Sequence, residues 1–361
     1  MASINTNASA LTALQSLNST NKNLEVTQTR ISTGYRVAEA SDNAAYWSIA
    51  TTMRSDYKAL STVQDSLGLG ASKVDTAYTG MNKAIETANE IKVKLVAAVG
   101  ATDADKAKIH TEIKALQSQL KAYADGATFS GSNMLSVDTT TGHAVAGTAD
   151  DVKIVSAFNR DAAGTASIST IDVKVEGIKL FDSGTTANLK NAGILDRSTA
   201  IYSSATAQGA YEAKLAERVA AGDHDVDAKT AAATAAATAA GAADGTATSI
   251  AGVSVANLDI TASGVTDAFI GSMLSKVEGA LKSMTTAATN LGAAKSRIEL
   301  QKAFTSSLMD SIDRGVGQLV DADMNKESTR LQALQVQQQL GIQALSIANG
   351  NSQSIMSLFR G

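Results

Sequence analysis

Side chains able to carry chemistry are sparse in this sequence and do not converge on a site. The three histidines, His110, His143 and His224, lie far apart, and no His-Glu-x-x-His or Gly-x-Ser-x-Gly motif occurs. The chain has no cysteine, which excludes a thiol nucleophile and a Cys-ligated metal. The sequence therefore predicts that the protein is not an enzyme and that it binds no metal or cofactor.

Two acidic segments could be taken for metal sites. The segment from Asp321 to Glu327 is similar to the start of a calcium loop, but Lys326 stands where that loop needs glycine and Gln332 where it needs glutamate. We interpret it as helix-start electrostatics or an inter-subunit contact. The second segment is an acidic cluster, interpreted as a solvated loop, that contains Asp223, Asp225 and Asp227.

The glycine-containing segment from Gly68 to Lys73 superficially resembles a phosphate-binding loop. It lacks the Walker spacing and the third glycine of the dinucleotide fingerprint. Two glycines inside a helix cost roughly 2 kcal/mol of helix propensity. Because the apolar periodicity continues through this segment, we expect a bendable place in a helix.

Composition favours long helices over a thick globular core. A chain of 361 residues would carry roughly 18 prolines at ordinary usage, yet this one has none. Proline breaks helices, so its absence suits a chain built of them. No unbroken apolar run is long enough to span a membrane, and the first 21 residues do not resemble a signal peptide. Without a basic stripe, nucleic acid is not an expected partner.

The elements follow from the apolar spacing. From Ile49 to Leu95 an apolar residue recurs about every 3.5 residues, which is typical of a helix in a coiled-coil seam. The pattern returns from Ile109 to Tyr123 and from Val277 to Ile298, continuing loosely to Leu319. We expect a turn at residues 100–105, with Thr102 or Asp103 capping the next helix.

Residues 138–264 differ from the rest. They include segments rich in alternating Val and Ile at 151–157, 168–181 and 250–260, which predict strands, and a helical pattern around residues 211–219. The Ala/Thr run 228–243 is compatible with a helix or a linker. The predicted fold is mainly α: long antiparallel helices from both termini form a coiled-coil or bundle core, with an inserted α+β outer domain. The expected domains are 1–43 with 321–361, 44–137 with 265–320, and 138–264.

The chain ends are amphipathic and uncharged. No charged side chain occurs before Lys22 or from Leu331 through Phe359. Such helices are poor surface elements. Either they pack on each other within one molecule, or, as we favour, they are buried between many copies of the protein. The apolar residues that repeat in these two segments are Leu11, Leu14, Leu17, Leu24, Ile31, Leu331, Leu334, Leu345 and Ile355.

Several motifs, in order along the chain, resemble bacterial flagellins. Residues 29–45 are similar to the N-terminal signature of that family, and residues 129–135 to the turn that closes its N-terminal core. The acidic segment at 321–327 and the Gln-rich stretch up to Arg360 resemble its C-terminus. The resemblance covers residues 1–137 and 265–361, and Tyr46-Trp47 looks like the alphaproteobacterial branch.

The resemblance implies a structural subunit of the flagellar filament that self-assembles for motility. It further implies an extracellular protein, secreted without a cleaved signal peptide and without membrane insertion. The implied partners are copies of itself, the flagellar type III export apparatus, an export chaperone, and hook-associated junction and cap proteins; co-assembly with other flagellins is left open. The alternatives are a hook–filament junction protein and, from another class, a secreted monomeric helical effector or adhesin.

Assembly is expected to depend on both termini. In addition to the repeating apolar residues, we assign Ile4 and Leu358 to it. In the family, arginines such as Arg30 and Arg36 sit where subunits meet, and a planar guanidinium suits pairing with carboxylates. The remaining assigned residues lie in the N-terminal signature: Asp42 and Asn43.

Overall fold

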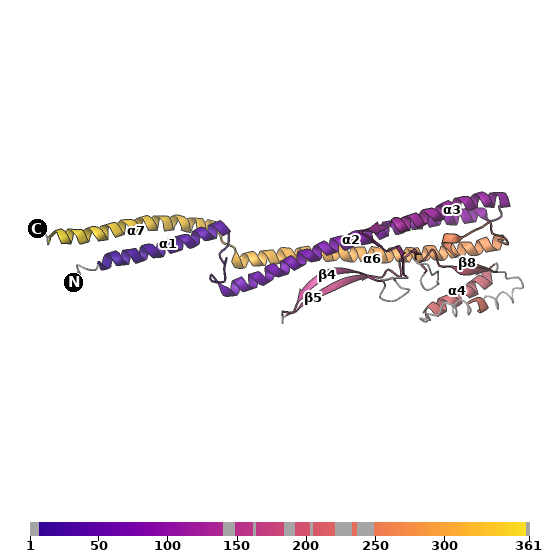
Figure 1. The fold of residues 1–361 in the computed structure, drawn as a ribbon, viewed down its shortest axis with the longest axis horizontal. Coiled ribbons are helices and arrows are strands. Elements are labelled where there is room, and N and C mark those ends of the chain that lie inside the picture. The colour runs from indigo at the N-terminus through magenta and orange to yellow at the C-terminus, as the bar shows by residue number, and fades with distance from the viewer. Residues whose placement is uncertain are drawn as a thin grey trace. The chain divides into compact units, whose positions relative to one another are not determined.

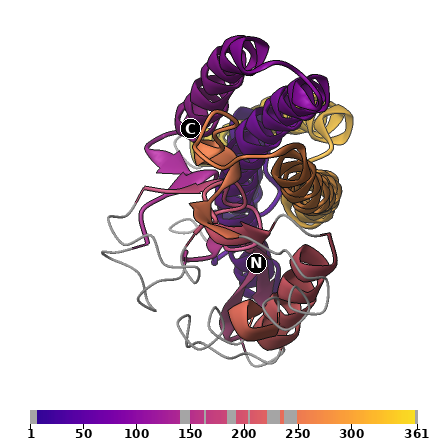
Figure 2. The ribbon, with the colours of Figure 1, turned by 90° about the vertical axis from the view of Figure 1, so that its right-hand side faces the viewer.

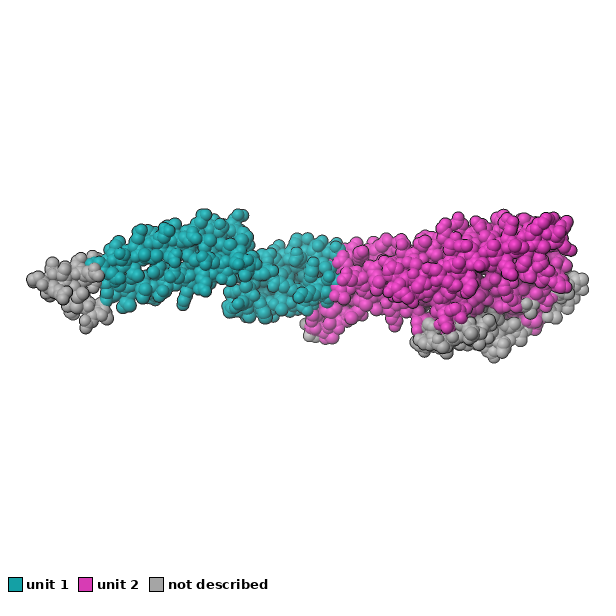
Figure 3. Space-filling view, turned by 45° about the horizontal axis from the view of Figure 1, so that its top comes forward, with its two compact units in different colours: residues 1–61, 306–361 teal, residues 62–305 magenta. Residues whose placement is uncertain are grey.

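The computed structural model describes residues 7–139, 149–161, 164–183, 192–202, 205–220, 233–236 and 249–358. The chain divides into two compact units, residues 1–61 with 306–361 (unit 1) and residues 62–305 (unit 2), coloured separately in Figure 3. The helices are α1 (Ala8–Thr33), α2 (Ala44–Ala98), α3 (Asp103–Gly126), α4 (Ala205–Ala220), α6 (Asp267–Val320) and α7 (Met324–Leu358). The strands are β1 (Thr128–Phe129), β2 (Ser132–Asn133), β3 (Ser136–Val137), β4 (Val152–Arg160), β5 (Ala166–Val173), β6 (Phe181–Asp182), β7 (Thr199–Tyr202) and β8 (Ser249–Val253).

The predicted mainly helical fold is confirmed, and the long helices lie where the apolar spacing places them. The turn after α2 contains Gly100 at φ 74°, and the Thr102 side chain accepts a hydrogen bond from the Asp105 amide at the start of α3. Thr102 is therefore the N-cap of that helix. The three-domain division remains a prediction.

Unit 2 is built on a heptad seam. Two series on α2 are almost completely buried and each repeats every seven residues; the first consists of Leu67, Val74, Met81, Ala88 and Leu95, and the second of Ala77, Ala84, Ile91 and Ala98. The matching series on α6 consists of Val277, Met284, Leu291 and Ile298. Figure 2 shows α2, α3 and α6 nearly end-on, with α4 and strands beside them. This arrangement confirms the predicted bundle from distant parts of the chain.

Ion pairs across the same seam fix its antiparallel register. Lys92 Nζ lies 2.7 Å from Glu278 Oε1, and Lys295 Nζ lies 2.5 Å from Asp75 Oδ1. In both pairs the residue numbers add up to 370, so the two contacts belong to one register. Each side chain is at least one third exposed, and exposed pairs contribute only about 0–1 kcal/mol. The ion pairs therefore specify alignment more than stability.

The glycine-containing segment of α2 has a packing role. Helix α2 runs through it without interruption. A Cβ atom on Gly70 would lie 2.4 Å from Ile154 Cγ2 of β4, whereas one on Gly68 would meet nothing within 4 Å. Gly70 thus lets the β4–β5 hairpin approach the helix closely.

The insert contains small sheets. Strands β4 and β5 pair antiparallel with an irregularity between Val155 and Ala157, and β7 and β8 also pair antiparallel. Strand β6 pairs in parallel with β3, which precedes the insert. Two predicted strands are too long. Residues 174–180 turn, with the Ile178 and Lys179 amides donating to the Val175 carbonyl, and residues 255–257 form a 3₁₀ turn capped by Ser254. In both places local hydrogen bonds replace pairing with a neighbouring strand. The predicted helix around 211–219 is present as α4.

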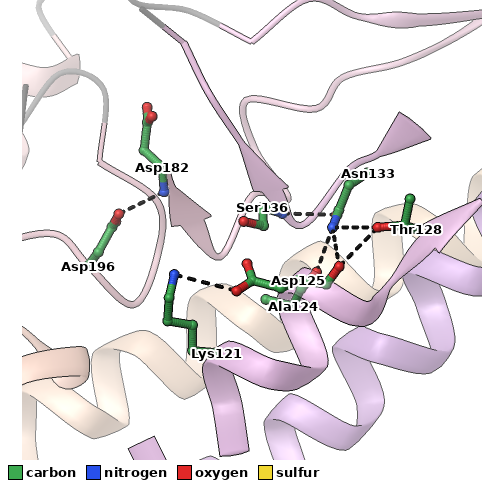
Figure 4. A network of polar contacts seen from close by, with 8 residues as sticks. All are labelled: Lys121, Ala124, Asp125, Thr128, Asn133, Ser136, Asp182 and Asp196. Carbon is green, nitrogen blue, oxygen red and sulfur yellow. Dashed lines mark hydrogen bonds and ion pairs between the residues drawn. The ribbon is translucent and has the colours of Figure 1, made fainter. Parts of the chain in front are cut away.

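Asn133 organises the turn that follows the C-terminal end of α3 (Figure 4). Its Nδ2 donates to the carbonyls of Ala124 (2.7 Å) and Asp125 (3.1 Å) at the end of α3. Its Oδ1 accepts from the amides of Leu135 (2.8 Å) and Ser136 (3.0 Å). One side chain therefore satisfies helix-end carbonyls and the following backbone amides at once.

Several predictions fall outside the described residues. They concern Ile4, His143, His224, the acidic cluster at 223–227 and the Ala/Thr run 228–243, of which only residues 233–236 are described, as helix. Ile355 and Leu358 lie in α7, with only their backbone described.

Candidate self-assembly interface

In unit 1, α1 and α7 lie side by side and antiparallel (Figure 1). Helix α1 is capped by Asn7, whose side chain accepts from the Ala10 amide, and it ends at Gly34 with φ 75°. The Asp323 carboxylate accepts from the amides of Asn325 and Lys326 at the start of α7. This supports the helix-start interpretation of the calcium-like segment. The described part of the chain has no cluster of three metal-ligating side chains.

The seam between the two helices follows a heptad frame. The less exposed positions alternate in steps of three and four residues on both helices. On α1 they are Ala10, Ala13, Leu17, Thr20, Leu24, Thr27 and Ile31. On α7 they are Leu331, Leu334, Gln338, Gly341, Leu345 and Ala348. The predicted repeat at Leu331, Leu334 and Leu345 faces this seam and is confirmed, as is the pairing of the two terminal helices within one molecule. Of the repeat predicted for the N-terminal segment, Leu11 and Leu14 lie outside the seam.

Polar contacts hold the seam in one register. Asn7 Nδ2 donates to the Ala348 carbonyl (2.9 Å), and Gln338 Nε2 donates to Asn21 Oδ1 (2.8 Å). At the other end, Arg30 Nη1 lies 3.4 Å from Glu327 Oε1. In the middle the helices come close, because a Cβ on Gly341 would lie only 3.2 Å from Leu17 Cδ1.

The pairing leaves large apolar side chains in water. On α1, Leu11 is 59% exposed and Leu14 44%. A shallow recess of about 530 Å³ beside them is lined by α1 residues from Leu11 to Lys22. On α7, four apolar side chains are each more than half exposed, namely Val336, Leu340, Ile342 and Ile347. Exposed apolar surfaces of this kind mark interaction sites.

Comparison with known proteins decides the family. The model of the bacterial flagellin N-terminal helical region matches residues 4–140, and that of the C-terminal helical region matches residues 274–359. The chain is 45% identical over 409 aligned residues to Flagellin A of Rhizobium meliloti. It is 46% identical over 361 residues to a flagellin of Brucella melitensis biotype 1. Both comparisons cover the full length of both chains.

The chain belongs to the bacterial flagellin family. This flagellin is a structural subunit of the flagellar filament, an extracellular helical assembly of many copies, and its family is a family of structural proteins. Its relatives are alphaproteobacterial, as the residues Tyr46-Trp47 indicated. No helix in the described ranges is long and apolar enough to cross a membrane.

The polar residues assigned to assembly make contacts within this flagellin chain. Arg36 Nη2 donates to the Leu319 carbonyl (2.8 Å), and Arg30 reaches Glu327. The Asp42 carboxylate accepts two amides of the α1–α2 connection, and Asn43 accepts from the Tyr46 amide at the start of α2. Their part in subunit contacts stays a prediction.

Sequence reasoning missed the exposed side of α7. The apolar repeat predicted for this helix included only residues on the side that faces α1, and it left out the apolar residues of the other side. A second stripe was readable at Val336, Leu340, Gln343 and Ile347, spaced by four, three and four residues. By helical geometry it lies on the side of α7 opposite the seam.

Proposed function

We propose that this flagellin polymerises through the faces of α1 and α7 that the seam leaves open. The observation that carries the proposal is the exposure of Leu11, Leu14, Leu340 and Ile347 on helices with almost no charge. Burying one large aliphatic side chain contributes about 1.5–3 kcal/mol. Each copy presents several exposed aliphatic side chains, so repeated contacts between copies would be stable.

The assigned apolar residues then divide into two groups. Leu17, Leu24, Ile31, Leu331, Leu334 and Leu345 act within the chain by forming the α1–α7 pair. Leu11 and Leu14 act between copies, together with the exposed stripe of α7. Ile4, Ile355 and Leu358 would extend these surfaces toward the chain ends.

The finer expectations belong to the same proposal. The chain would be exported through the flagellar type III apparatus, with an export chaperone and without a cleaved signal peptide. It would then assemble between hook-associated junction proteins and a cap, alone or with other flagellins. It would have no catalytic role. The termini, the helical bundle and residues 138–264 would form the three domains named above.

Seeded polymerisation of purified full-length protein tests the proposal. Leu340→Gln and Leu11→Gln keep the side-chain size and add a polar group. We expect each to raise the critical concentration about tenfold or more, since 1.4 kcal/mol corresponds to a factor of ten. Gln335→Ala, on the flank of α7, is the matched control and should polymerise normally. Normal filaments from the Leu11→Gln/Leu340→Gln double variant, with unchanged monomer helicity, would refute the proposal.

A further inference from the structure

A second open surface of unit 1 lies beside the α1–α2 connection. It is a recess of about 410 Å³ (the Tyr35 recess). The residues that shape it include Tyr35, Arg54, Tyr57, Lys58, Ile312 and Val316. The two tyrosines are 38% and 37% exposed, and Arg54 Cζ lies 4.8 Å from the centroid of the Tyr35 ring.

The chemistry of this recess suits a flat aromatic side chain. Tyr35 and Tyr57 offer ring faces or edges for stacking, and Ile312 and Val316 offer aliphatic contacts. Arg54 adds a guanidinium, which is attracted to an aromatic face and most strongly to that of tryptophan. An indole would therefore bind here better than an aliphatic side chain.

The chain exposes such a side chain. Trp47, the sole tryptophan, is 39% exposed on the first turn of α2. Its neighbour Tyr46 lies 5.9 Å from the Arg36 guanidinium, whereas no described residue makes a ring or cation contact with Trp47. Tryptophan is usually well buried, and at interfaces it is enriched among the residues that carry most of the binding energy.

Trp47 does not fill the recess of its own chain. It is absent from the lining of the recess, and it lies seven residues from Arg54 on the same helix. Seven residues correspond to about 10 Å along an α-helix. An indole in the Tyr35 recess would therefore have to come from a second copy.

We propose that Trp47 of one flagellin copy binds in the Tyr35 recess of a neighbouring copy in the filament. This inference rests on the proposed self-assembly. Each copy carries both the side chain and the recess at different places, so the same contact can repeat head-to-tail from one copy to the next. Head-to-tail contacts generate open helical filaments when the rotation between copies does not close a ring.

The sole tryptophan makes the contact directly measurable. Indole emission and acrylamide quenching are recorded for the full-length monomer and for filaments grown from it on seeds. We expect a blue shift and an at least about threefold lower quenching constant in the filament, since the indole leaves water. Filaments with an unshifted, fully quenchable indole would overturn the inference while leaving assembly through α1 and α7 intact. A wild-type protein that stays monomeric with seeds would contradict both.

Variants decide whether the indole is shielded by this recess. Tyr57→Ala and Arg54→Gln filaments should regain most of the monomer's quenching, whereas Phe304→Ala, which removes an exposed aromatic ring of α6, should not. Trp47→Ala should raise the critical concentration about tenfold, and Trp47→Ala/Arg54→Gln should be little worse than Trp47→Ala alone. Additive effects, or full shielding retained in Tyr57→Ala filaments, would place the indole elsewhere and overturn the inference. Circular dichroism of each monomer verifies that the fold persists.

Discussion

Lys276 shows, at the scale of one residue, how a buried charge joins the insert to the bundle. It lies on α6, and its ammonium donates to Thr199 of β7. Burial lowers the pKa of Lys276 to about 8, an effect that the nearby Glu212 opposes and Arg197 reinforces. The unfolded chain should hold this proton up to the ordinary pKa of about 10.4. Between these two values, the unfolded state binds a proton that the folded state has released.

Stability should therefore rise with pH across this window. The full pKa shift corresponds to on the order of 3 kcal/mol of stability. We expect Lys276→Met to remove this pH dependence of stability. The variant should also unfold at a higher urea concentration than the wild type near neutral pH, since a methionine places no charge in the interior. Urea unfolding near neutral pH and at about pH 10 measures both effects. Lys282→Met, at an exposed site of the same helix, should keep the wild-type slope; equal slopes for all three proteins would contradict the prediction.

At the scale of elements, sequence reasoning succeeded where one periodicity ran through a whole helix. The heptad spacing in α2 and α6 was enough to predict which face of each helix is buried and that the two helices share one bundle. The strand ends at residues 174–180 and 254–257 could not be predicted in this way, because side-chain caps and turn hydrogen bonds decided them. The packing role of Gly70 could not be predicted either, since it depends on contact with Ile154, which is 84 residues away in the chain.

The contact of α2 with β4 gives an element-scale prediction with an internal control. Replacing a helical glycine with alanine stabilises an exposed helix by up to about 1 kcal/mol. Gly68→Ala should follow this rule, because the added methyl group meets open space. Gly70→Ala should instead destabilise unit 2 by about 1–3 kcal/mol, because Ile154 is β-branched and cannot easily move aside.

Thermal unfolding of the two glycine variants, of Ile154→Ala and of Gly70→Ala/Ile154→Ala measures this difference. Ile154→Ala makes room for the new methyl group, so the double variant should lose less than the sum of the single losses. Equal melting temperatures for Gly68→Ala and Gly70→Ala would argue against close packing at this position.

At the scale of the whole molecule, the sequence predicted the seam between α1 and α7 better than the apolar side chains that stay exposed outside it. The absence of charge at both termini was enough to predict burial, and the apolar repeat identified the seam face of α7, whereas on α1 it also included the exposed Leu11 and Leu14. Neither could separate burial within a chain from burial between chains, because both use the same types of apolar residue. The structure separates the two kinds of residue, because Leu11, Leu14 and Leu340 stay exposed after α1 and α7 have paired and are therefore available for contacts between copies.

Charge placed within the exposed stripe of α7 tests this separation. Gln343 lies between Leu340 and Ile347 in the stripe, while Gln338 lies in the seam and contacts Asn21. A lysine at 343 would be solvated in the monomer and would lose that solvation between copies, which costs several kcal/mol unless it is paired. We therefore expect Gln343→Lys to keep the monomer's helicity and melting temperature and to raise the critical concentration of seeded assembly at least about tenfold.

The two matched variants distinguish the faces of α7. Gln335→Lys puts the same charge on the flank of the helix and should assemble nearly as the wild type does. Gln338→Lys should weaken the α1–α7 pair itself, seen as faster amide exchange in α1 before any assembly. If Gln343→Lys assembled like Gln335→Lys, the exposed stripe would not be a contact between copies. The uncharged termini would then be explained by their pairing within one chain.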